Sequence, residues 1–216
     1  MLRNRQLTIP PSVSHYIMTM DTFDKVWNKF ESLIEEKKSC SICMKKLIEI
    51  LKSEMSKKTY EKLTSIDFQT EVNLVKEHII SELKNKPLAK SIKGIWFGIA
   101  KYSDENKNLE YYAFYLAGSK KFDVENTEWA TTFEYETNSG IFLLEAMNEV
   151  DLIIKKDSKF CELGDWIIPI SYFSFIINEC FMNNEFKKSF LINKEEVGVA
   201  IGYDDGDYIN LRIKKE

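Results

Sequence analysis

Three aspartates surround one glycine in the segment VGVAIGYDDGDYINL, residues 197–211. They are Asp204, Asp205 and Asp207, and the glycine is Gly206. Clustered carboxylates bind hard cations such as Ca²⁺, and carboxylates also act as general acids and bases. The spacing matches no calcium-binding loop: counted from Asp204, the first aspartate, the twelfth position holds Lys215 where a calcium loop places a glutamate.

Turn chemistry explains the same residues. A three-residue loop made by Asp204, Asp205 and Gly206 sets Ile201 opposite Ile209, so that one face of the hairpin becomes wholly apolar. The same loop sets Val199 opposite Leu211 and Val197 opposite Ile213. Such a loop favours glycine in the left-handed conformation at its last position. We therefore predict a hairpin turn without a metal; a cation site or an acidic recognition loop is the alternative.

Cysteines and histidines give weaker signals. The pair Cys40 and Cys43 has the spacing of half a zinc site, but no second Cys-x-x-Cys is present. Both lie on one apolar helical stripe, which predicts two buried thiols. Neither His15 nor His78 lies in a nucleophile or phosphate-loop motif. We expect no catalytic residue of these types, no metal and no cofactor.

A second group of carboxylates follows residue 120. A pair among them could act as in a glycosidase, but a solvated loop explains them more simply, and we favour the loop. Its members are Asp123, Glu125, Glu128, Glu134 and Glu136.

Apolar periodicity predicts the elements that position these residues. Residues 1–20 contain Pro10 and Pro11 and are expected to form a flexible arm. Residues 21–90 carry three apolar stripes at helical spacing, which predict three amphipathic helices over residues 21–86.

Residues 91–216 change to a β-rich pattern. Two strands joined by SDENKN predict a hairpin over residues 92–119, with Tyr111 and Tyr115 on one face. The strands of this hairpin are apolar on both faces. A strand of that kind is expected to lie centrally in its sheet and to be covered on both sides. The run in residues 139–150 fits either a strand or a helix, and we favour a strand. Pro169 is expected in the first turn of a deeply buried helix.

These patterns predict an α+β protein. We expect the N-terminal amphipathic helices to pack with a mainly antiparallel sheet of about five strands plus one buried helix. The helical segment and the sheet segment are expected to form one continuous domain.

Charge is unevenly distributed. The net charge is −4, with 16 Lys and Arg against 12 Asp and Glu in residues 1–90, and 14 against 22 in residues 91–216. The acidic half disfavours nucleic acid; its charge either keeps the protein soluble, which we favour, or suits a basic protein partner. No apolar run has the length of a membrane span or a signal peptide, so a cytoplasmic location without membrane contact is expected.

Two segments together resemble a group of small bacterial proteins. They are YYAFYLAGSKKFDVENTEWA, residues 111–130, and VAIGYDDGDYINL near the C-terminus. The group is similar to immunity-type proteins found beside polymorphic toxins, and the likeness covers residues 95–213. One departure is TTFEYETNSG, which lacks the proline-containing acidic segment expected after Ala130.

This resemblance implies a cytosolic protein that binds a toxin domain and occludes its active site. The expected contact charges are Asp123, Glu125, Glu128, Asp204 and Asp205. The alternatives are a carboxylate-dependent or metal-dependent hydrolase, or a regulatory or scaffold module. The sequence does not define the oligomeric state or the partner.

Overall fold

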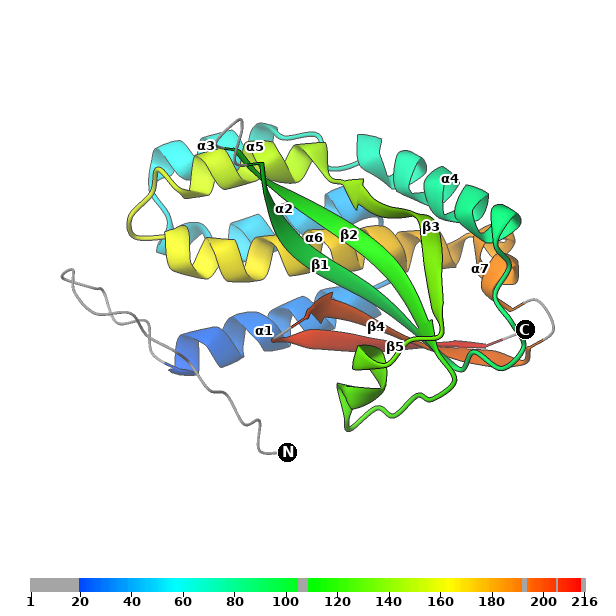
Figure 1. Cartoon of the computed structure of the whole chain (residues 1–216). Helices are drawn as coiled ribbons and strands as arrows, with labels where there is room; N and C mark the ends of the chain where they lie inside the picture. Colours follow the sequence, from blue (N-terminus) through cyan, green and yellow to red (C-terminus); the bar gives the residue numbers. More distant parts are fainter. Residues whose placement is uncertain (1–19, 105–108, 192–193, 205, 215–216) are drawn as a thin grey trace.

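The computed structural model describes residues 20–104, 109–191, 194–204 and 206–214 (Figure 1). The predicted arm, residues 1–20, therefore lies outside the described residues except for Met20. The chain belongs to the α+β class, as the sequence predicts, with the α-helices stacked against one face of a sheet.

In the described part of the chain, four α-helices and a 3-10 turn come first. The helices are α1 (Met20–Glu35), α2 (Cys40–Ile50), α3 (Lys57–Ser65) and α4 (Thr70–Asn85), with η1 (Lys52–Glu54) between α2 and α3. The prediction of three helices was wrong because α3 has almost no apolar stripe. In α3 only Thr59 and Leu63 are buried, and Ser56 caps the helix by accepting from the Thr59 amide at 3.2 Å.

Within the described residues the sheet has five strands, in the order β3-β2-β1-β4-β5. They are β1 (Gly94–Asp104), β2 (Leu109–Ser119), β3 (Tyr135–Leu143), β4 (Glu196–Tyr203) and β5 (Tyr208–Lys214). The predicted hairpin of β1 and β2 is confirmed, and so is the register of the final hairpin, in which Ile201 faces Ile209. The sheet is nevertheless mixed, because β1 and β4 run parallel.

A helical crossover connects β3 to β4, as a parallel pairing of distant strands requires. It contains α5 (Glu145–Ile154), α6 (Cys161–Met182) and α7 (Asn184–Phe190). The ambiguous run 139–150 is divided between two elements, since the strand ends at Leu143 and the helix starts at Glu145.

The central helix α6 is buried nearly all round, as predicted. Pro169, however, lies inside the helix and not in its first turn. A proline has no amide hydrogen, so the carbonyl four residues earlier, at Asp165, loses its helical partner. The Tyr203 hydroxyl donates to the Trp166 carbonyl at 3.0 Å. It also lies 3.4 Å from the freed carbonyl oxygen of Asp165.

The two faces of the sheet are covered differently. Side chains such as Phe97, Phe114 and Val199 face the helices and belong to the main core. The opposite face, which we call the helix-free face, carries a small separate cluster and the segment η2 (Thr127–Thr131). We expected β1 and β2 to be covered on both sides. Helices cover one side only (Figure 1), and η2 with the small cluster lies on the other.

Candidate functional site

The aspartate turn closes the hairpin of β4 and β5. The Tyr203 amide donates to the Asp207 carbonyl at 3.1 Å, and the Gly206 amide donates to the Tyr203 carbonyl at 3.3 Å. The loop therefore has the three residues that the apolar register predicts. The expected left-handed conformation at Gly206 was wrong, because its φ lies outside the left-handed range.

The carboxylates of this turn diverge. Asp204 accepts a hydrogen bond from the Tyr115 hydroxyl on the helix-free face. Asp207 accepts one from the Trp166 indole of α6, at 2.7 Å on the helical side. Asp205 lies outside the described residues. No group of three or more His, Cys, Asp or Glu in the described part of the chain is placed to hold a metal ion.

The buried-thiol prediction for Cys40 and Cys43 is confirmed. Both side chains are buried, and burial raises the pKa of each thiol. Both therefore stay protonated near neutral pH and are poor nucleophiles.

The acidic loop between β2 and β3 holds the other three predicted contact charges. Asp123, Glu125 and Glu128 are all exposed. The loop is fixed from within, because the Trp129 indole donates to the Asp123 carbonyl at 3.0 Å and the Glu125 amide donates to the Asp123 side chain at 2.8 Å. It is also joined to β5, since the Asn210 amide group donates to the Val124 carbonyl at 3.2 Å.

This loop and Asp204 both contact the helix-free face. The Phe122 ring lies against Gly198 of β4, and the Tyr115 ring lies against Gly98 of β1. A side chain at either glycine would collide with the ring above it. The central strands therefore provide a floor of small residues on which aromatic rings lie.

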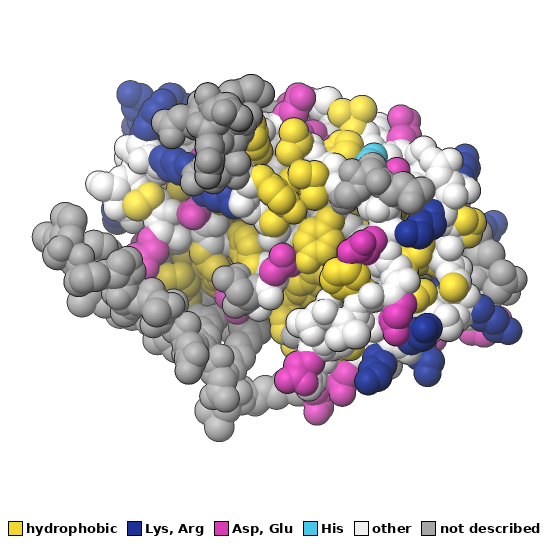
Figure 2. Space-filling view, viewed as in Figure 1, with side chains coloured by type: hydrophobic (Ala, Val, Ile, Leu, Met, Phe, Trp, Pro, Cys, Tyr) yellow, Lys and Arg dark blue, Asp and Glu magenta, His cyan; other side chains and the backbone are white. Residues whose placement is uncertain are grey.

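The same face exposes apolar side chains at its β3 edge. Ile141 and Leu143 are 40% and 45% exposed, and Tyr102 of β1 is also exposed. Ile141 pairs with Tyr115 and Leu143 pairs with Ala113, so they share the face with the aromatic rings. Figure 2 shows this apolar surface in the middle of the view, with carboxylates around it.

The five carboxylates considered for catalysis are exposed. The Glu134 carboxylate accepts a hydrogen bond from the Lys120 backbone amide at 2.9 Å. Glu128 is bonded to its neighbour Asn126, whose side chain donates to it at 3.3 Å. None of the five lines the cavity that the described structure shows between the sheet and helices α5 and α6.

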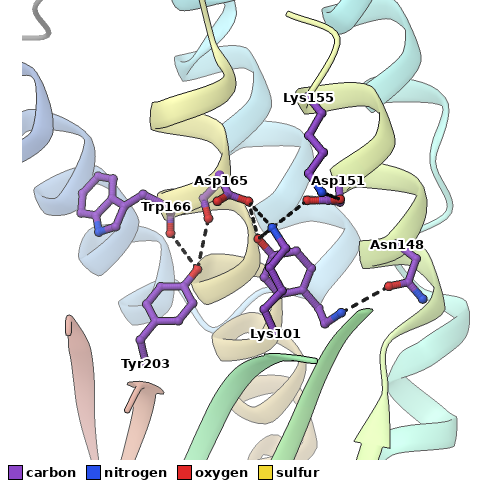
Figure 3. Close-up of polar contacts among 8 residues, drawn as sticks. Lys101, Asn148, Asp151, Lys155, Asp165, Trp166 and Tyr203 are labelled. Atoms are coloured by element: carbon purple, nitrogen blue, oxygen red, sulfur yellow. Dashed lines mark hydrogen bonds and ion pairs between the residues drawn. The ribbon is translucent and has the colours of Figure 1, made fainter. Parts of the chain in front are cut away.

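That cavity, of about 810 Å³, lies beside the C-terminal half of β1, and sequence reasoning missed it. Lys101 is its central cation (Figure 3). The Lys101 ammonium donates to Asp151 and to Asp165, at 3.0 Å each. It also donates to the Tyr112 hydroxyl at 3.2 Å, and Lys155 binds the second oxygen of Asp151 at 2.7 Å.

The tyrosines of the cavity are hydrogen-bond donors. The Tyr112 hydroxyl donates to Asp165, and burial, followed by this bond, raises its pKa far above the usual range. Burial, followed by the charge of Asp165, likewise raises the pKa of Tyr203. Both hydroxyls therefore remain protonated at any physiological pH and cannot act as general bases.

Only one local signal pointed to this cluster in the sequence. Asp151 and Lys155 stand four residues apart, the spacing of an ion pair on a helix. Lys101, Tyr112 and Asp165 come from three separate elements, and nothing in their spacing indicates that they meet.

Comparison with protein-family models, with curated proteins and with solved structures found no match. Among the described residues, every helix is too short or too polar to cross a membrane.

Proposed function

We propose that this protein is a cytoplasmic, immunity-type protein that binds a toxin domain through the helix-free face and neutralises it by occlusion. The observation that carries the proposal is the exposed apolar surface of that face, at Tyr102, Ile141 and Leu143, beside ordered aromatic rings. Exposed apolar patches bordered by polar groups are typical of protein-binding surfaces.

The aromatic side chains of this face are held in place before any partner arrives. The Trp96 indole donates to the Tyr115 hydroxyl at 3.1 Å, and that hydroxyl donates to Asp204. Tyr115 is only partly buried, so the ring offers area to a partner without further ordering. Rigid aromatic anchors of this kind dominate binding energy at protein interfaces.

Charge favours a basic partner. Exposed carboxylates at Asp123, Glu125 and Glu128 lie in the loop that covers one end of the face, and Asp204 lies in the turn at another border. Complementary charge of this kind accelerates association more than it strengthens the final complex.

The test is binding to the product of the neighbouring gene. Co-expression is expected to protect cells from that toxin, and the purified proteins are expected to form a complex. Ile141→Asp, together with Leu143→Asp, should weaken the complex at least about tenfold, because a charge then enters the apolar contact. Leu74→Asp is the matched control, since Leu74 is an exposed leucine on α4, with an exposed fraction of 52%.

Charge reversal supplies a separate readout. Glu128→Lys is expected to slow association and reduce its dependence on salt, with little change in dissociation. If co-expression protects against no neighbouring toxin and no complex forms, the immunity function is wrong. If a complex forms but the Ile141 and Leu143 variants bind normally, the surface is wrong.

A further inference from the structure

The cavity around Lys101 exists because two neighbouring strands end at different levels. Strand β4 pairs with β1 only as far as Ile99 and Tyr203, whereas β1 continues to Asp104. Helices α5 and α6 pass behind this step. The hollow is lined by Lys101, Tyr112, Glu162, Asp165, Trp166 and Asp204, among others.

Aromatic rings form its rigid wall. Trp166 stacks on Trp27 with 5.8 Å between ring centroids and meets the edge of Phe23 at 4.9 Å. Tyr203 is fixed through its hydroxyl to the carbonyl oxygens of α6, at 3.0 Å from that of Trp166. The wall is therefore built into the core of the helical layer.

The cations of the hollow are already engaged. Among the described groups, the Lys101 ammonium donates to Asp151, Asp165 and the Tyr112 hydroxyl, enough acceptors for its three hydrogens. Lys155 is bound to Asp151 at 2.7 Å. An anionic ligand would have to displace a carboxylate from one of these lysines.

The carboxylates at the rim are less occupied. Asp165 receives Lys101 and Tyr112 on one oxygen, Oδ1, and its side chain is 51% exposed. Glu162 is exposed one helical turn before it, and Asp204 faces the same hollow from the β4–β5 turn. With Asp151 included, four carboxylates surround two lysines among the described residues, which gives this group a net formal charge of −2.

We propose that this hollow binds an organic cation, a guanidinium or primary ammonium group carried on an extended chain. Its volume, about 810 Å³, lies within the range of small-ligand sites. The rim carboxylates would accept charge-assisted hydrogen bonds from the cation, and the aromatic wall adds cation–π attraction. A bare metal ion fits less well, since the described carboxylates do not form a chelating group.

This inference does not rest on the immunity function. The cation could be a free small molecule, or an arginine or lysine side chain of a bound protein. Asp204 connects the two regions, because it lines the hollow and also accepts from Tyr115 on the helix-free face.

The test titrates the purified full chain with agmatine, which carries both a guanidinium and an ammonium group, by calorimetry and by NMR. Saturable binding with a Kd of about 1 mM or tighter is expected, weakening with salt. Glutarate, a dianion of similar length, should not bind. Absence of saturable agmatine binding in that range would overturn the proposal.

Variants place the ligand in the hollow. Glu162→Gln removes a rim charge that makes no bond to another described side chain, and Asp165→Asn removes the second. The double variant should weaken agmatine binding at least about tenfold. Glu185→Gln, an exposed carboxylate on α7, is the control, and unfolding curves check each fold. Equal binding by the double variant and the control would also overturn the proposal.

A last comparison separates the two sources. An acetylated and amidated Gly-Arg-Gly peptide that binds more tightly than agmatine indicates a protein side chain as the natural occupant. Tighter binding of agmatine indicates a free small cation. Either result supports the site, whether or not a toxin partner exists.

Discussion

The two faces of the sheet use large and small side chains in opposite ways. On the helical face, large residues such as Phe97 and Ile201 point from the strands into the core and are wholly buried. On the helix-free face, the central strands offer Gly98, Gly198 and Ala200, and the rings of Tyr115 and Phe122 lie across them.

This difference separates stability from recognition. The helical face buries most of the apolar surface and makes the larger contribution to the free energy of folding. The helix-free face buries little, yet its Tyr115 ring is fixed by Gly98 below it and by the bond from the Tyr115 hydroxyl to Asp204. Substitutions on the two faces should therefore affect different measurements.

The largest effect is expected on the helical face. Phe97 is fully buried and its ring lies 6.1 Å from those of both Phe173 and Phe190. Phe97→Ala should lower the free energy of unfolding by about 3–5 kcal/mol, because it leaves a cavity. Denaturant unfolding followed by circular dichroism measures this. A loss below about 1 kcal/mol would contradict the assignment of the main core to this face.

A smaller loss is expected beneath the rings. Gly98→Val should cost about 1–3 kcal/mol, since its side chain would displace the Tyr115 ring. Adding Tyr115→Ala to Gly98→Val should recover part of this loss, because the collision is removed. If Tyr115→Ala lowers the stability of the Gly98→Val protein as much as it lowers that of the unmodified protein, the ring does not rest on this glycine.

The bond from Tyr203 to α6 is expected to contribute about 1 kcal/mol. Tyr203→Phe removes the hydroxyl that donates to the Trp166 carbonyl at 3.0 Å, next to the carbonyl freed by Pro169. In a Pro169→Ala background, the helix regains its own amide, so the same substitution should cost less. Equal costs in both backgrounds would show that the hydroxyl does not compensate for the proline.

A buried carboxyl of the helical layer should respond to pH. Burial raises the pKa of Glu71, although its carboxylate accepts from Tyr172 at 2.7 Å and from the Ala146 amide at 3.1 Å. A raised folded-state pKa means that the folded protein binds the extra proton, so stability falls as pH rises above about 4.5 through that pKa. Glu71→Gln should reduce this fall, measured as unfolding free energy from about pH 4 to pH 7. If the unfolding free energy of the Glu71→Gln variant depends on pH as before, the raised pKa of Glu71 is contradicted.

The smallest stability effect is expected at the exposed edge of the helix-free face. Ile141→Ser should change the free energy of unfolding by no more than about 0.5 kcal/mol, because the side chain is 40% exposed. It should nevertheless weaken partner binding. A large loss of stability there would show that the edge serves folding and not recognition.

Local patterns predicted much of this molecule. The register of the β4–β5 hairpin followed from one apolar face, since Val197, Val199 and Ile201 face apolar partners only in that alignment. The strand pair β1 and β2 and the burial of Cys40 and Cys43 followed from equally local patterns. The short helix α3 could not be predicted, because tertiary contacts and a cap stabilise it more than any stripe of its own.

The position of Pro169 shows why local rules fail inside a core. A proline is expected at a helix start because the freed carbonyl is costly elsewhere. Here Tyr203, 34 residues away along the chain, supplies the donor. The sequence alone determined the α+β class, the turn at Asp204 and the acidic character of the second half. Only the tertiary structure brought Lys101, Asp151 and Asp165 together and left one sheet face without helices, because both depend on contacts between residues far apart in the chain.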